Sequence, residues 1–71
     1  MVAANCNGPS YRLTFDDAVN VWLRYWAGEY QNRIAASFDV NSARVNEVLK
    51  GHRHIGSEDR AREIAAREAA A

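Results

Sequence analysis

The chain has 71 residues, of which 48% are hydrophobic, and its nine basic residues balance its nine acidic residues, so its formal net charge is zero. This length allows one small domain, and the hydrophobic content argues against a wholly disordered chain. The apolar runs are too short for a transmembrane helix, and residues 1–10 resemble no secretory signal. The single cysteine, Cys6, cannot form an internal disulfide, which is compatible with a cytoplasmic location.

Residues 1–10 contain Asn, Gly, Pro and Ser and show no periodic apolar face, so we expect a flexible N-terminal arm. Arms of this kind sometimes reach DNA, but no Lys or Arg precedes Arg12, and a plain arm is the favoured interpretation. Cys6 has no base or cation nearby in the sequence to activate its thiol. We therefore do not expect a reactive cysteine.

The first predicted helix begins at Thr14 and ends at Gly28. Thr14, followed three residues later by Asp17, resembles a capping box, and acidic side chains suit the positive end of a helix. We expect Trp22 and Trp26, one turn apart, to form part of the core, with a dimer contact or a partner surface as the alternative. The apolar positions at helical spacing are Phe15, Ala18, Val19, Trp22, Leu23 and Trp26, with Val21 and Tyr25 beside them.

Residues 31–51, QNRIAASFDVNSARVNEVLKG, are predicted to form two short helices joined by a tight turn. Asp39 lies where such a turn needs a positive φ, which aspartate tolerates less well than glycine. Asn41 or Ser42 can cap the second helix, and Gly51 can end it in a left-handed conformation. This pattern predicts a helical hairpin and does not by itself indicate DNA binding. The inward positions are Ile34, Ala35 and Phe38, then Val45, Val48 and Leu49.

The same stretch resembles the helix-turn-helix of the phage-repressor class of DNA-binding proteins, and the run around it resembles small bacterial and phage regulators. Asp39, in place of glycine, is the main departure. The resemblance implies that the second helix reads the major groove of double-stranded DNA and that Gln31 contacts a phosphate; an exposed polar residue is the alternative for Gln31. The similarity is carried by Gln31, Ile34, Ala35, Phe38, Val40, Val45, Val48 and Gly51, with Gly28 before them.

The outward positions of the predicted recognition helix carry short or polar side chains that suit a groove. Ser42 can bond to several base edges, Ala43 can contact a thymine methyl, and Asn46 can pair with adenine. Glu47 can accept a hydrogen bond from cytosine, although its charge opposes the phosphates. Arg44 and Lys50 are better placed for phosphates. The alternative for each is a solvated helix face. The complete set of candidate DNA-contacting residues is Gln31, Arg33, Asn41, Ser42, Ala43, Arg44, Asn46, Glu47, Lys50, His52, Arg53 and His54.

Between residues 31 and 56, four basic and two acidic residues leave a local charge of +2, before any protonation of His52 and His54. Exposed charges are screened beyond about 8–10 Å at physiological salt, so the zero net charge permits DNA binding without supporting it. His52, Arg53 and His54 follow Gly51 directly and could together hold a phosphate, with an ordinary loop as the alternative. The two histidines and a distant cysteine lack the spacing of a zinc site, so we expect no metal and no cofactor.

A last helix is predicted over residues 57–71, with Ser57 as its cap, Ile64 as its only large apolar residue, and a frayed end. The sequence therefore predicts an all-α fold of about four helices, divided into an arm (1–10), a helix-turn-helix domain (11–56) and a C-terminal helix (57–71). The dimer surface is left open between the first helix and the last.

Sequence-specific double-stranded DNA binding by a homodimeric transcriptional regulator is the leading functional interpretation. The alternative is a protein-interaction adaptor or inhibitor that keeps the fold without using DNA. An enzyme is not expected, because the sequence has no phosphate-binding glycine loop, no paired catalytic carboxylates and no nucleophile beside a base.

Overall fold

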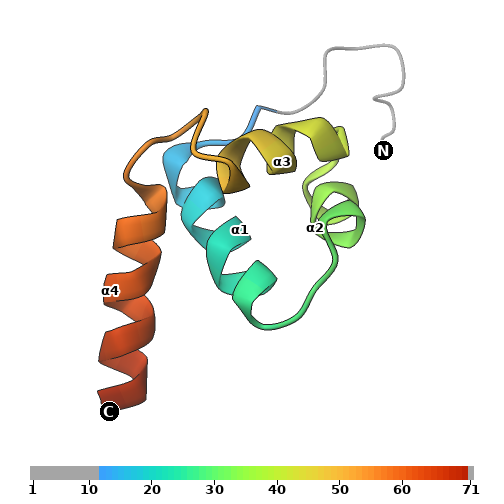
Figure 1. Ribbon diagram of the computed structural model, residues 1–71. Helices are drawn as coiled ribbons and strands as arrows, with labels where there is room; N and C mark the ends of the chain where they lie inside the picture. Colours follow the sequence, from blue (N-terminus) through green and yellow to red (C-terminus); the bar gives the residue numbers. More distant parts are fainter. Residues whose placement is uncertain (1–11, 71) are drawn as a thin grey trace.

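A computed structural model describes residues 12–70, and within this range the chain forms four helices and no strands. The all-α prediction is therefore confirmed (Figure 1). The predicted arm and Cys6 lie outside the described residues. None of the helices in residues 12–70 has the length and apolar character needed to cross a membrane. The helices are α1 (Phe15–Trp26), α2 (Gln31–Phe38), α3 (Ser42–Leu49) and α4 (Ser57–Ala70).

Local hydrogen bonds fix where α1 begins. The Asp17 N–H donates to Thr14 Oγ1 at 3.1 Å, and the Thr14 N–H donates to Asp17 Oδ2 at 3.0 Å, which is a reciprocal capping box. Thr14 is thus the cap, and Phe15 is the first helical residue. The predicted capping box is confirmed.

The turn after α2 has the left-handed residue that the sequence predicts. Asp39 has a φ of 58°, its N–H donates to the Ala36 carbonyl at 3.1 Å, and the Val40 N–H donates to the Ala35 carbonyl at 3.0 Å. These two bonds form a Schellman motif, which satisfies carbonyls left free at a helix end. The chain can therefore reverse tightly into α3 even with aspartate in place of glycine.

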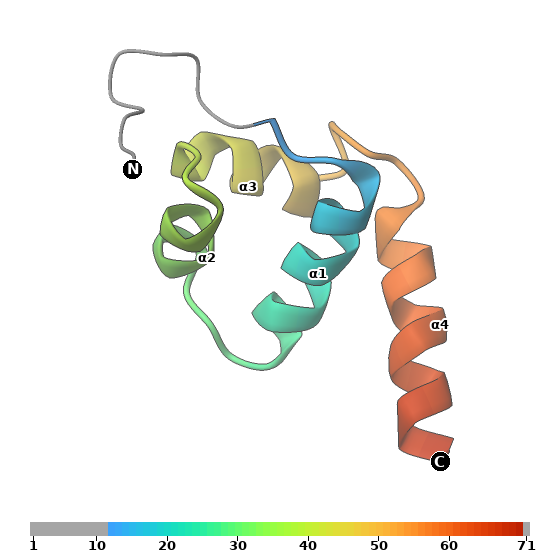
Figure 2. The same cartoon turned by 180° about the vertical axis from the view of Figure 1, so that it is seen from behind.

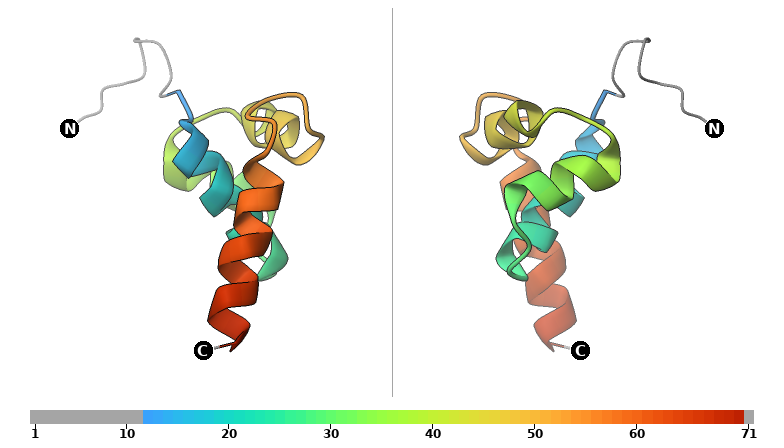
Figure 3. Two further views of the ribbon diagram at one scale, coloured as in Figure 1. Left: turned by 90° about the vertical axis from the view of Figure 1, so that its left-hand side faces the viewer. Right: turned by 90° about the vertical axis from the view of Figure 1, so that its right-hand side faces the viewer.

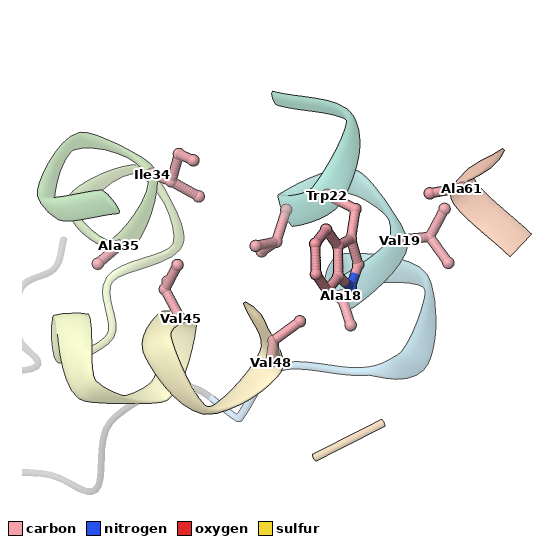
Figure 4. Close-up of a cluster of buried hydrophobic side chains, with 9 residues drawn as sticks. Ala18, Val19, Trp22, Ile34, Ala35, Val45, Val48 and Ala61 are labelled. Carbon is pink, nitrogen blue, oxygen red and sulfur yellow. The ribbon is translucent and has the colours of Figure 1, made fainter. Parts of the chain in front are cut away.

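The core lies where α1 meets the other three helices (Figure 4). Ile34, Val21 and Val45 are fully buried, and Trp22 keeps only 8% of its surface exposed. In Figure 4, Val19 of α1 lies beside Ala61 of α4. The complete buried set is Ala18, Val19, Val21, Trp22, Ile34, Ala35, Val45, Val48 and Ala61.

Two aromatic residues of the predicted apolar face lie at the edge of the core. Phe15 is 42% exposed and Trp26 is 40% exposed, whereas Val21 is completely buried. The core expectation is therefore correct for Trp22 and wrong for Trp26, which instead contacts the Trp22 ring at a centroid distance of 5.5 Å. The Arg62 guanidinium also lies over the Trp26 ring, 5.3 Å from its centroid.

Helix α4 packs along α1, and its last turns run past the end of α1, away from α3 (Figures 2 and 3). The prediction that Ser57 caps α4 is wrong. Ser57 is the first helical residue, it is 2% exposed, and its hydroxyl accepts a hydrogen bond from Trp22 Nε1 at 3.2 Å. Burial diverts the hydroxyl to a donor on α1, so Ser57 joins α4 to the core. The chain is helical as far as Ala70, and the predicted fraying stays a prediction.

Candidate nucleic-acid interface

Helix α3 has one buried side and one exposed side. Val45 and Val48 are completely or almost completely buried, while the side chains of Ser42, Ala43 and Arg44 are exposed. In Figures 1 and 2, α3 lies at one end of the domain, with α1 and α2 on one side of it. A helix held in this way presents a row of side chains to a partner outside the domain.

The amino-terminal end of α3 is built by Asn41. Its Oδ1 accepts a hydrogen bond from the Ala43 N–H at 2.8 Å, so Asn41 is the cap and Ser42 is the first helical residue. The cap leaves the side chains of Ser42 and Ala43 exposed at this end of the helix. Side chains near the amino terminus of a recognition helix are the ones that read bases in a major groove.

Two predicted site residues from different helices meet each other. Asn46 Nδ2 of α3 donates to Gln31 Oε1 at the start of α2, at 3.4 Å, which is long for a hydrogen bond. An asparagine amide has two N–H donors and an acceptor oxygen. This contact therefore uses one N–H of Asn46, and it leaves the other N–H and the Oδ1 outside the contact with Gln31.

Glu47 lies among cations rather than alone on the helix surface. Its Oε2 is 3.1 Å from Arg44 Nη2, and its Oε1 forms an ion pair with Arg53 Nε at 2.9 Å, without the alignment of a hydrogen bond. Spacing along the helix could have suggested the Arg44 contact. Nothing in the sequence indicates the Arg53 contact, because it depends on how the chain turns after α3.

The basic residues of the motif fall into two groups. Arg44 and Arg53 share the Glu47 carboxylate, whereas Arg33 and Lys50 are exposed and form no ion pair with any residue in the range 12–70. Only the second pair is immediately available to phosphates. The local charge of +2 is thus distributed unevenly over the motif.

The basic sequence after α3 does not act as one cluster. His52 and Arg53 are exposed, but His54 is partly buried and has a φ of 53°. Its Nε2 lies 2.9 Å from the Leu13 carbonyl oxygen, and its ring contacts Phe15 edge-on at 6.4 Å. Because a carbonyl only accepts, Nε2 donates. His54 therefore ties the loop to the start of α1, and the structure separates it from the other two residues.

The sequence analysis did not identify Arg24, a residue of α1 that contacts α2. Arg24 donates from Nε and Nη2 to the two oxygens of Glu29, at 2.9 and 2.7 Å, and from Nη1 to Ser37 Oγ at 2.6 Å. Its guanidinium also lies over the Phe38 ring, 5.6 Å from the centroid. The hydrogen bonds raise the pKa of Arg24 and lower the pKa of Glu29. An Arg and a Glu on either side of Gly28 were the only sequence signal.

Within the part of the chain that the structure describes, no three His, Cys, Asp or Glu residues lie together in a way that could hold a metal ion. Comparison with known protein families, with curated proteins and with solved structures finds no match to this chain. The interpretation of the site therefore depends on its own residues and geometry.

Proposed function

We propose that this protein binds double-stranded DNA sequence-specifically, with α3 in the major groove, as a small homodimeric transcriptional regulator in the cytoplasm. The observation that carries the proposal is the exposed outer side of α3, held by a left-handed turn after α2 and by two buried valines. B-DNA's major groove admits an α-helix, and the exposed residues at the start of α3 are small or polar.

Three residues of α3, the exposed Ser42 and Ala43 and the half-buried Asn46, each have a base partner that their chemistry suits. Ser42 offers a hydroxyl to base edges, Ala43 offers a methyl to thymine, and Asn46 offers the donor and acceptor that adenine needs. Lys50 and Arg33, which form no ion pair within residues 12–70, would neutralise phosphates. Base reading and phosphate contact would therefore come from different residues.

The distribution of charge reconciles DNA binding with a net charge of zero. Helix α4 carries four acidic residues, two of which pair with α4 arginines, and it runs away from α3 (Figure 3). Glu63 and Glu68 belong to the later turns of α4, and because exposed charges are screened beyond about 8–10 Å, they contribute little to the potential at the outer side of α3. Glu58 and Asp59, in the first turn, lie nearer, since they line the same pocket as Val48 and Gly51.

A homodimer is part of the proposal because one recognition helix reads only a short half-site, and a twofold pair reads two. Tyr25 and Trp26, at the end of α1, are 43% and 40% exposed, and aromatic residues of this kind are enriched at interfaces. The dimer is testable by sedimentation, in which Trp26→Ala would shift the protein toward monomer.

A salt titration of binding to duplex DNA of random sequence tests the DNA proposal. Lys50→Ala removes a cation at the end of α3, and Arg67→Ala is its matched control, an exposed α4 cation that also forms no ion pair among the described residues. Wild-type affinity should fall steeply with salt, and Lys50→Ala should reduce the slope of log K against log salt by about 0.9. Arg67→Ala should leave the slope unchanged. Absence of binding at low salt would refute the proposal.

A protein-interaction module is the second candidate, and one observation favours it. Tyr25, Trp26 and Tyr30 expose 43%, 40% and 73% of their surfaces around the connection between α1 and α2. Such a surface could hold a protein partner instead of a second copy. The titration distinguishes the two candidates, because this module predicts no affinity for DNA at low salt.

A further inference from the structure

One carboxylate in the helix-turn-helix serves two arginines. Glu47 is 28% exposed, and the arginines that it contacts, Arg44 and Arg53, are 46% and 56% exposed. Arg53 reaches Glu47 because the chain reverses at Gly51, where the His52 N–H donates to the Glu47 carbonyl oxygen at 2.9 Å. The three charged side chains therefore form one group, with Arg44 and Glu47 on α3 and Arg53 in the loop after it.

The position of this carboxylate is unfavourable for simple DNA affinity. Residues three and four apart share a helix face, so Glu47 lies in one row with Ala43 and Lys50, on the side of α3 proposed to enter the groove. A negative side chain there is repelled by phosphates and also occupies two cations that could bind them. The arrangement weakens binding to DNA of arbitrary sequence.

We propose that Glu47 is a specificity-determining residue. In the free protein its carboxylate takes the place of DNA phosphates and pairs with Arg44 and Arg53. The inference rests on the proposed DNA-binding function. On DNA of arbitrary sequence the carboxylate keeps both arginines, and phosphate contacts are lost. On a site with cytosine opposite Glu47, the N4 amino group donates to the carboxylate. Glu47 then releases its arginines to the neighbouring phosphates, so that base reading and phosphate binding occur together.

A helix-stabilising ion pair is the plain alternative, and the chain contains one for comparison. Arg60 Nη1 on α4 lies 3.2 Å from Glu63 Oε1, with the same spacing of three residues that separates Arg44 from Glu47. Glu63 is 64% exposed and pairs with one arginine, whereas Glu47 is 28% exposed and pairs with two. Glu63→Gln and Glu47→Gln change the net charge equally, so Glu63→Gln is a matched control.

The experiment measures affinity for a short duplex of random sequence, across a range of salt, for wild type, Glu47→Gln and Glu63→Gln. Circular dichroism first confirms that each variant is folded. Glu47→Gln should bind random DNA about ten-fold more tightly, and its salt slope should steepen by up to about 1.8, because two arginines become free. Glu63→Gln should match wild type in slope and in affinity.

A second set of variants tests whether the gain in affinity depends on Arg44 and Arg53. Replacing both Arg44 and Arg53 by alanine in the Glu47→Gln background should abolish the gain in random-duplex affinity and in salt slope, because the gain comes from those two arginines. Against a site selected by wild type from a random library, Glu47→Gln should lose at least about ten-fold of the preference over random DNA.

The outcomes separate the two proposals. If wild type binds DNA but Glu47→Gln binds random duplex no more tightly than Glu63→Gln, the role of Glu47 is refuted and the DNA-binding proposal stands. If wild type does not bind duplex DNA at low salt, the DNA-binding proposal fails, and the role of Glu47 fails with it.

Discussion

The hydrogen bond between Trp22 and Ser57 gives the most direct test of how α4 is attached to the domain. Ser57→Ala removes a buried acceptor and leaves the indole N–H of Trp22 without its 3.2 Å partner. A buried donor left unsatisfied costs about 1–3 kcal/mol. For a domain of this size, 1 kcal/mol lowers Tm by about 4–8 °C, so a cost of about 2 kcal/mol corresponds to a fall of about 8–16 °C.

Thermal and urea denaturation followed by circular dichroism measure this cost. Ser42→Ala is the matched control, because Ser42 is also the first residue of its helix but is exposed. We expect its effect on the free energy of unfolding to stay within about 0.5 kcal/mol. A loss in Ser57→Ala no larger than in Ser42→Ala would refute the assigned role of Ser57.

A double-mutant cycle separates the hydrogen bond from packing. Trp22→Phe removes the donor, so Ser57→Ala made in that background no longer leaves an unsatisfied N–H. The cost of Ser57→Ala should then be smaller by about 1 kcal/mol or more. Equal costs in both backgrounds would show that the serine acts through packing alone.

Three further predictions concern the backbone, at two positions, and the acid side of the stability profile. Asp39→Gly should raise the free energy of unfolding by about 1 kcal/mol, because a φ of 58° disfavours a residue with a Cβ. Gly51→Ala should lower the free energy of unfolding by about 1 kcal/mol through backbone conformation alone, since a Cβ there meets nothing within 4 Å. Thermal denaturation of both variants measures these effects, and unchanged Tm values would contradict the reasoning. The pKa of Glu29 lies below its ordinary value of 4.5 because Arg24 hydrogen-bonds to it, so its stabilising contribution is present above 4.5 and is lost as pH falls through the lowered pKa. Arg24→Leu should flatten that acid-side loss in urea denaturation at stepwise pH, and parallel curves for the two proteins would contradict the assignment.

The helices were predictable because their ends are encoded locally. Thr14 with Asp17, Asp39 in its left-handed turn and Asn41 at its cap each act through neighbours in the chain, so short patterns in the sequence suffice. The same holds for Val45 and Val48, whose spacing identifies the inner side of α3.

What the sequence could not predict depends on contacts between distant segments. Helical periodicity identifies the apolar side of α1, but it does not show which residues at the margins of that side are covered by other helices. Phe15 and Trp26 lie at the surface, while Val21 is completely buried. The hydroxyl of Ser57 looked like a cap because its partner lies 35 residues away in the chain. His54 likewise turned toward Leu13, a contact set by the loop after α3.

The charges of the motif show the same limit. Counting residues predicts a local charge of +2, but only the three-dimensional arrangement shows that Glu47 occupies Arg44 and Arg53 and leaves Arg33 and Lys50 exposed. The candidate site was thus predictable as a set of residues, and not as a pattern of free and paired groups.

Mapping backbone amide chemical shifts during titration with duplex DNA tests the central claim most directly. DNA binding through α3 predicts that the largest shifts fall on residues 41–47 and on Gln31, with small changes around Tyr25 and Trp26. Shifts concentrated around Tyr25 and Trp26, or the absence of shifts at low salt, would contradict a role for α3 as a recognition helix.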